Sequence, residues 1–298
     1  MAIKTVRAQV NGTWHTLTYD SASGAYTATI TAPGATSFHQ SGGYYNVMVE
    51  ATNDAGTTVS ANGVSLSGLQ LFVRERVAPV IAILSPSAGA YVSTSTPNIV
   101  FNVTDETGGS GVDTSSIVVK IDGAAVSNIT TTAITNGYSV TATPGAALSD
   151  GSHTVTVDVS DNDGNAATQQ SVTFTVDTVP PTLNITSPGE GYITNNKTVN
   201  VAGTTNDVTS SPVTIKISLN GTDQGAVTVA TNGSFAKSVT LAEGENTIVI
   251  TATDAAGRVS TVSRTVKLDT SVPAIQSAVI TPNPVDAGAT MIISVVIA

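Results

Sequence analysis

Two loops rich in Gly and Asn gather acidic side chains, which are Asp105, Glu106, Asp113, Asp161 and Asp163. Proteins bind Ca²⁺ through about six to eight oxygen ligands, often from flexible loops of this kind. We therefore expect Ca²⁺, the one cofactor that the residues suggest, in at least one of the two loops. A second interpretation stays open, because Asp and Asn also supply the hydrogen bonds of tight turns, and neither loop follows the full EF-hand pattern.

Residues that could catalyse a reaction are scarce. The chain has three His residues, His15, His39 and His153, and no Cys. It lacks the Gly-x-Ser-x-Gly turn that exposes a nucleophilic Ser. It also lacks the phosphate loop, the dinucleotide-binding fingerprint and the spacing of zinc ligands. We expect the His residues to lie in turns or on the surface, with no catalytic residues and no enzyme activity.

The charge and hydropathy of the chain narrow its partners. With 21 acidic and 11 basic residues, the formal net charge is −10 and the isoelectric point is near 4.5. Nucleic acid is bound through clustered Lys and Arg, so we expect no nucleic-acid partner. A spanning helix needs about 18 or more apolar residues in a row, and because no segment reaches that length we expect no membrane insertion.

The elements that hold these loops are predicted to be strands. Polar and apolar residues alternate over 154–159 and 213–219, which places every second side chain in a core. No segment has a convincing helical periodicity, so we expect an all-β fold. Pairs that readily adopt the positive φ of hairpin turns separate the runs, and these are Asp122-Gly123, Asn136-Gly137, Asp150-Gly151, Asn220-Gly221 and Asn232-Gly233.

Internal repeats divide the strands into modules. Similar segments begin at Pro79, Pro181 and Pro273, and the steps between them are close to one β-sandwich of about 100 residues. Because Pro restricts φ and withholds a backbone donor, each strand must stop there and the linker stays short and stiff. The predicted modules are 1–76, 77–178, 179–270 and an incomplete module at 271–298.

Three motifs recur at these boundaries and late in the modules. They are Asp-Thr-x-x-Pro at 177–181 and 269–273, Ser-Pro-x-x-Gly-x-Tyr at 85–91, and Ala-Thr-Asp-Ala-Ala-Gly at 252–257. They resemble the bacterial immunoglobulin-like repeats of surface adhesins and phage tail proteins. Segments 6–14 and 42–47 are similar to the leading domain of tail-associated proteins of phages and prophages. The resemblance implies tandem immunoglobulin-like β-sandwich modules. It indicates the fold of the protein more than its function.

The last residues of the chain form a separate case. A buried strand is predicted there by the apolar residues Met291, Ile293, Val295 and Ile297. Either the module that begins at 271 is cut short, or this strand completes a sheet of another subunit. We favour the first interpretation, because the spacing after Pro273 matches the start of a module.

Together these features favour a structural and adhesive role. Our first hypothesis is a protein of a phage tail or related virion particle, a homo-oligomer within that assembly. Its partners would be other subunits and a host cell-surface glycan or protein. The N-terminus lacks the apolar run of a secretory signal, which suits a protein that leaves the cell by lysis. The alternatives are a bacterial cell-surface or secreted adhesin and the accessory modules of a surface glycosidase.

Overall fold

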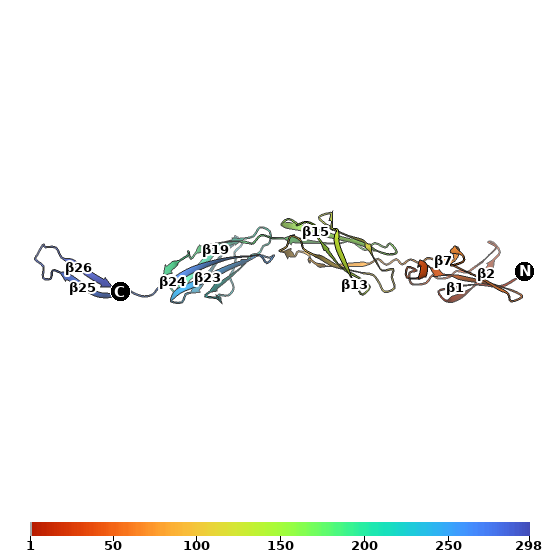
Figure 1. The fold of residues 1–298 in the computed structure, drawn as a ribbon, viewed down its shortest axis with the longest axis horizontal. Coiled ribbons are helices and arrows are strands. Elements are labelled where there is room, and N and C mark those ends of the chain that lie inside the picture. Colours follow the sequence, from red (N-terminus) through yellow and green to blue (C-terminus); the bar gives the residue numbers. More distant parts are fainter. Residues whose placement is uncertain (1) are drawn as a thin grey trace. The chain divides into compact units, whose positions relative to one another are not determined.

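The computed structural model describes residues 2–298 and consists almost entirely of strands (Figure 1). The chain forms two compact units, 1–178 and 179–298. Within the described residues the helical elements are two short 3₁₀ turns, Ser41–Gly43 and Ser67–Leu69. No helix there is long and apolar enough to cross a membrane. The all-β fold predicted from the alternating residues is confirmed.

The first module is one five-stranded sheet with a thin second layer. The sheet has the order β3-β2-β1-β5-β6, and its strands are β1 (Ile3–Val10), β2 (Thr13–Asp20), β3 (Ala25–Thr27), β5 (Met48–Asn53) and β6 (Thr58–Asn62). The second layer is the short pair β4 (Tyr45–Asn46) and β7 (Gln70–Leu71). Among residues 2–76 the buried apolar side chains are Val6, Ala8 and Tyr45, so this module has a small core.

The second module is a full sandwich of two sheets, β13-β14-β10-β8 and β12-β11-β15-β16-β9. Phe101 on β10 and Phe174 on β16 are completely buried between the sheets, and each such side chain stabilises the fold by roughly 1.5–3 kcal/mol. The strands are β8 (Val80–Ser85), β9 (Tyr91–Val92), β10 (Ile99–Thr104), β11 (Val112–Ile121), β12 (Ala124–Ala125), β13 (Asn128–Ile134), β14 (Gly137–Thr143), β15 (Gly151–Asp161) and β16 (Gln170–Val176).

The third module repeats this sandwich with one strand fewer. Its sheets are β17-β19-β22 and β18-β24-β23-β20-β21. In the second module β13 pairs with β14 along its whole length, whereas the corresponding segment, 224–231, meets β22 through the isolated bridge Val229–Phe235. The strands are β17 (Thr182–Ser187), β18 (Tyr192–Thr194), β19 (Thr198–Asn206), β20 (Thr214–Leu219), β21 (Thr222–Asp223), β22 (Ser234–Thr240), β23 (Gly244–Thr253) and β24 (Val259–Leu268).

Two of the five Asx-Gly pairs form the predicted hairpin turns with positive φ at both residues, whereas Asp150-Gly151 lies at the start of β15 and forms no such turn. Asp122 and Gly123 join β11 to β12 with φ of 51° and 83°, and Asn220 and Gly221 join β20 to β21 with φ of 52° and 81°. Positive φ at both central residues is the geometry that matches the twist of the flanking strands.

Residues 271–298 form one hairpin. In it β25 (Ile275–Thr281) pairs with β26 (Ile292–Ile297) in antiparallel register. Ile293 is 60% exposed and Ile297 61% exposed, and Val295 and Met291 are exposed as well. The strand predicted near the end of the chain is therefore present with one partner in the chain itself, but the prediction that it is buried is wrong, because no second sheet of the described chain covers it. Its pairing with another subunit stays a prediction.

Candidate cation site between the first and second modules

Two of the predicted Ca²⁺ ligands come together where β10 ends. Asp105 is 7% exposed, and its Oδ2 accepts the backbone N–H of Gly111 at 2.7 Å. Its Oδ1 is buried and has no hydrogen-bond partner among residues 2–298. Glu106 is the next residue and is exposed. A buried carboxylate oxygen without a partner is costly, so Oδ1 marks a position where a cation would stabilise the module.

Glu75 adds a third carboxylate from the segment that links the first module to the second. Its Oε1 accepts the backbone N–H of Ser110, and its Oε2 is buried without a hydrogen-bond partner in the described part of the chain. Glu75, Asp105 and Glu106 each offer one oxygen, and these atoms lie within 4.8 Å of one another. Such a set of carboxylate oxygens suits a hard divalent cation such as Ca²⁺.

The protonation of the cluster reflects its crowded negative charge. The adjacent carboxylate of Glu75, together with burial and the neighbouring Asp105, raises the pKa of Glu106 to about 7. Burial also acts to raise the pKa of Glu75, but its interactions with Glu106 and Ser110 outweigh burial and lower that pKa. Carboxylates held this close retain a proton between them, and a divalent cation could replace that proton.

Gly109 lies where the three carboxylates converge. A Cβ at this position would lie 2.6 Å from Oε2 of Glu75 and 2.7 Å from Oδ2 of Asp105. Both distances are shorter than a normal non-bonded contact, so any larger residue would push the carboxylates apart. The Gly-rich character of this loop therefore has a local cause in the packing of the cluster.

Two other predicted ligands lie at the ends of strands β11 and β15 and accept local hydrogen bonds. Asp161 is 2% exposed, and its oxygens accept the backbone N–H and the side-chain Nδ2 of Asn165 at 2.8 and 2.7 Å. Asp113 is more exposed, and its Oδ1 accepts the backbone N–H and the hydroxyl of Ser115 at 2.9 and 2.6 Å. These hydrogen bonds are those of turns, which was the second interpretation of the loops.

Asp163 connects the second module to the first. Its Oδ2 accepts the hydroxyl of Thr36 at 2.6 Å and the backbone N–H of Glu75 at 3.0 Å. Nearby, Nε2 of His39 lies 2.8 Å from the carbonyl oxygen of Gly109. Thr36 and His39 both belong to the first module, so hydrogen bonds from both sides hold the linker that carries Glu75.

The third module has a related pair of carboxylates at the ends of β19 and β23. Asp207 is 9% exposed and Asp254 is 6% exposed, with one oxygen of each within 4.8 Å of the other. Oδ1 of Asp207 accepts the backbone N–H groups of Thr209 and Ser210 at 2.8 and 2.7 Å. Oδ2 of Asp254 has no hydrogen-bond partner among residues 2–298. The second and third modules thus both carry buried carboxylates where their strands end.

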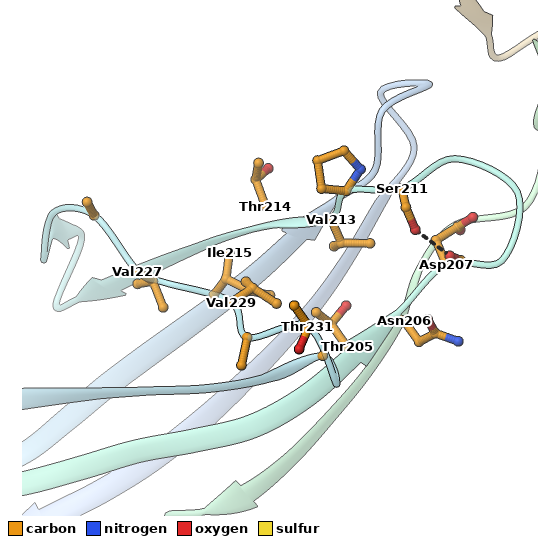
Figure 2. A pocket seen from close by; sticks show the side chains of 14 residues that line it. Thr205, Asn206, Asp207, Ser211, Val213, Thr214, Ile215, Val227, Val229 and Thr231 are labelled. Atoms are coloured by element: carbon orange, nitrogen blue, oxygen red, sulfur yellow. Dashed lines mark hydrogen bonds between the residues drawn. The ribbon is translucent and has the colours of Figure 1, made fainter.

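A groove of about 580 Å³ opens in the third module beside this acidic end (Figure 2). Val213, Ile215 and Val229 give it apolar walls, and Ser211 at its rim donates its hydroxyl to the backbone oxygen of Asp207 at 2.7 Å. The segment that corresponds to β13 lines it, so the groove accompanies the loss of that strand. Asp207 is its one ionisable lining residue within 2–298, which gives it no pair of groups for acid–base catalysis.

The expectation that the His residues lie in turns or on the surface is wrong for His153, which lies in strand β15 and is buried. His153 is 6% exposed, with Nδ1 lying 2.6 Å from Oδ2 of Asp122 and Nε2 lying 2.8 Å from the backbone oxygen of Ser149. Because both ring nitrogens already contact acceptors of the fold, this His–Asp pair has no nitrogen left to activate a nucleophile. A catalytic base needs a free nitrogen within reach of its target.

Sequence reasoning missed Glu75, although a signal for it exists. Glu75 precedes Val77 by two residues, as Asp177 precedes Val179 by two residues. The acidic residue before each Val-x-Pro junction therefore recurs, but it was assigned to the end of the preceding module. A ligand contributed by a linker becomes visible only when the repeats are aligned across the junction.

Two-layered sandwiches in tandem, with hairpin turns and a buried acidic junction, define a protein of repeated immunoglobulin-like β-sandwich modules. The family model of a bacterial Ig-like domain matches residues 89–178, and the model of domain B of glucodextranase matches residues 181–270. A comparison with curated proteins finds no match.

Several solved structures are similar to the chain in fold. The fibronectin(III)-like modules of CbhA from Clostridium thermocellum are 17% identical with a TM-score of 0.42, covering 63% of this chain and 94% of theirs. Immunoglobulin domains 1–5 of Sidekick-1 are 13% identical with a TM-score of 0.38, covering 92% and 56%. A 1.5-MDa bacterial ice-binding adhesin is 22% identical with a TM-score of 0.30, covering 89% and 86%.

Proposed function

We propose that this chain is a non-enzymatic structural and adhesive protein whose modules are spaced stiffly along the polypeptide. The observation that carries the proposal is the junction of the first two modules. There the linker residue Glu75 is hydrogen-bonded to Ser110, Asp163 and Asn165 of the second module, while Asp163 also holds Thr36 of the first. A linker held on the second module, which also contacts the first module directly, transmits position and force, which is the task of a spacer.

We place this spacer on a phage tail or related virion particle, as a homo-oligomer within the assembly. The similarity of segments 6–14 and 42–47 to the leading domain of tail-associated proteins supports this location. Contacts with other subunits would use exposed strands such as β26, whose Ile293 and Ile297 are 60% and 61% exposed. Contacts with a host glycan or protein would use exposed loops and strand edges.

The alternative is an adhesin of a bacterial cell surface or an extracellular adhesin, which the match of residues 89–178 to a bacterial Ig-like domain also fits. A role as accessory modules beside a glycosidase has one specific observation in its favour, the match of residues 181–270 to domain B of glucodextranase. All three roles share the same physical basis, which is the display of rigid β-sandwiches.

Electron microscopy of native particles, with antibody against this chain, separates these roles. Regular, symmetric labelling of tails supports the virion location. Labelling confined to cell walls favours the adhesin, and co-purification with a glycosidase activity favours the accessory role. Either of the last two results would overturn the virion location while leaving the spacer role intact.

We further propose that Ca²⁺ binds the cluster of Glu75, Asp105 and Glu106 and fixes the first module on the second. The support is geometric, since two buried oxygens of the cluster have no hydrogen-bond partner within residues 2–298. The second module also holds nine of the 21 acidic residues and one of the 11 basic residues, which attracts cations. The chain itself supplies three ligands, and Ca²⁺ completes its shell with water.

Calorimetric melting and titration of the full chain test the cation site. We expect excess Ca²⁺ to raise the melting temperature of the first unit relative to chelator, because a ligand that binds only the folded state stabilises it. Asp105→Asn should abolish the shift, whereas Asp113→Asn, a matched change in the same loop outside the cluster, should preserve it. Equal melting temperatures with Ca²⁺ and with chelator in the unaltered chain would exclude the site.

A further inference from the structure

The second and third modules each end in the same contact, which we name the linker clamp. In the second module Asp150 accepts the backbone N–H and the hydroxyl of Thr178 through Oδ1, at 2.8 and 2.9 Å. In the third module Glu243 accepts the same two groups of Thr270, at 3.0 and 2.8 Å. Both Thr residues follow the last strand of their module, so the clamp holds the chain where it leaves the sandwich.

In the second module a buried His supports the clamp. His153 is 6% exposed, and its two ring nitrogens lie 2.6 Å from Oδ2 of Asp122 and 2.8 Å from the backbone oxygen of Ser149. A carboxylate and a carbonyl can only accept hydrogen bonds, so both contacts are satisfied only when both nitrogens carry a proton. Ser149 directly precedes Asp150, and the cationic ring therefore fixes the residue next to the clamp.

In the third module a neutral pair takes the same place. Nδ2 of Asn246 donates to the backbone oxygen of Ala242 at 2.7 Å, and Oδ1 of Asn246 accepts from Nδ2 of Asn220 at 3.0 Å. Oδ1 of Asn220 accepts the backbone N–H of Thr247 at 2.8 Å. Oδ1 of Asp122 accepts the N–H of Thr154 at 2.8 Å in the same way. We call the pairs His153–Asp122 and Asn246–Asn220 the two anchors. They share their geometry, but only the His–Asp anchor can change charge.

The groups around His153 favour its cationic form. Asp122 faces it from the turn between β11 and β12, and Asp150 lies on the adjacent loop with its carboxylate on Thr178. From β16 the ring of Phe174 lies 5.8 Å away, and Asp177 follows that strand. Burial lowers the pKa of His153, but the hydrogen bonds with Asp122 and Ser149 and the charge of Asp122 together raise it above its ordinary value.

We propose that the linker clamp of the second module is a pH-sensitive hold on the outgoing chain, closed while His153 is a cation and loosened when it loses its proton. The clamp of the third module is anchored by the neutral side chains of Asn246 and Asn220, so it holds throughout the pH range in which histidine changes charge. One chain thus carries a titratable and a fixed version of the same contact.

Nuclear magnetic resonance of the full chain tests this proposal directly. Between about pH 5.5 and about pH 8.5, where histidine changes charge, the amide order parameter of Thr178 should fall from about 0.85 toward about 0.6. That of Thr270 should stay constant. The fall should follow the ring nitrogen resonances of His153, which should show two protonated nitrogens at the acidic end.

Matched variants separate the anchor from general effects of pH. The double variant Asp122→Asn with His153→Asn copies the neutral anchor and should make Thr178 insensitive to pH. The reverse exchange, Asn220→Asp with Asn246→His, should make Thr270 sensitive. A constant order parameter for Thr178 in the unaltered chain, or a His153 ring that is neutral at every pH, would overturn the proposal without any variant having to fold.

Discussion

The carboxylate of Asp163 accepts a hydrogen bond of 2.6 Å from the hydroxyl of Thr36, a residue 127 positions earlier in the chain. Thr36 is 4% exposed, so this contact is shielded from water and joins two modules. The same carboxylate oxygen accepts the backbone N–H of Glu75. One side chain therefore ties the first module and its linker to the second module.

Removing this side chain should weaken the junction. Asp163→Ala leaves the N–H of Glu75 without an acceptor and leaves the hydroxyl of Thr36 only the backbone oxygen of Val73 at 3.2 Å. The loss of a buried donor's partner costs about 1–3 kcal/mol. We expect that loss in the free energy of unfolding of the first unit, measured by denaturant titration. Asp113→Ala is the control, because Asp113 serves an exposed turn and such changes cost about 0.5 kcal/mol or less. Equal losses for the two variants would contradict the role of Asp163.

A methyl group at Gly109 should disturb the carboxylate cluster. Gly109→Ala brings a Cβ within 2.7 Å of oxygens of Glu75 and Asp105, and overpacking of this kind costs about 1–3 kcal/mol. Calorimetry should show both a lower melting temperature and a smaller stabilisation by Ca²⁺. Gly145→Ala is the matched control, since a Cβ there would meet nothing within 4 Å. Unchanged melting of the Gly109 variant would show that the cluster tolerates displacement.

The core of the second module should depend strongly on its buried rings. Phe174 is completely buried between the two sheets, and Phe174→Ala should lower the free energy of unfolding by about 3–5 kcal/mol. Val118→Ala, on β11 of the same sheet with a side chain 40% exposed, should cost less than about 1 kcal/mol. Urea denaturation followed by circular dichroism gives both values, and a small loss for the Phe174 variant would argue against the packing described.

The free energy of unfolding of the second module should decrease at both acidic and basic pH because of one pair of residues, Asp122 and His153. The backbone N–H of Thr154 and the ring of His153 lower the pKa of Asp122, so its contribution is present above about pH 4 and is lost as the pH falls through the folded value. The raised pKa of His153 gives a contribution that is complete below about pH 6.5 and is lost as the pH rises through the folded value.

Denaturant titrations across this range should therefore give the highest free energy of unfolding of the first unit at mildly acidic pH. The variant with Asn at both positions should have a flatter profile. A profile of unchanged shape in that variant would mean that other groups set the pH dependence.

Local signals in the sequence were sufficient for most of the strands and for two of the hairpin turns. Asp122-Gly123 and Asn220-Gly221 adopt the positive φ that such pairs favour, because turn geometry is decided by the residues within the turn. The candidate carboxylate cluster could be anticipated from the sequence only in part. Asp105 and Glu106 belong to the cluster, but the third carboxylate comes from Glu75, which lies 30 positions before Asp105 in the chain, and only an alignment of the repeats across the junction points to it.

The lost strand of the third module was also beyond local prediction. Segment 224–231 has the Val- and Ala-rich character of a strand, yet it meets β22 at a single bridge, Val229 to Phe235. Whether such a segment joins a sheet depends on the space and hydrogen-bonding groups offered by its neighbours. The corresponding sequences look alike in both modules, so the open groove beside this segment depends on tertiary packing.

The small core of the first module has a consequence for how such chains can be recombined. Its buried apolar residues within 2–76 are Val6, Ala8 and Tyr45, and its contacts through Thr36, His39 and Glu75 end on the second module. A cut between residues 76 and 77 would separate a weakly packed sheet from the surface that supports it. A cut after residue 178 would follow a complete core. Exchange of modules between proteins of this kind should therefore move residues 1–178 as one cassette.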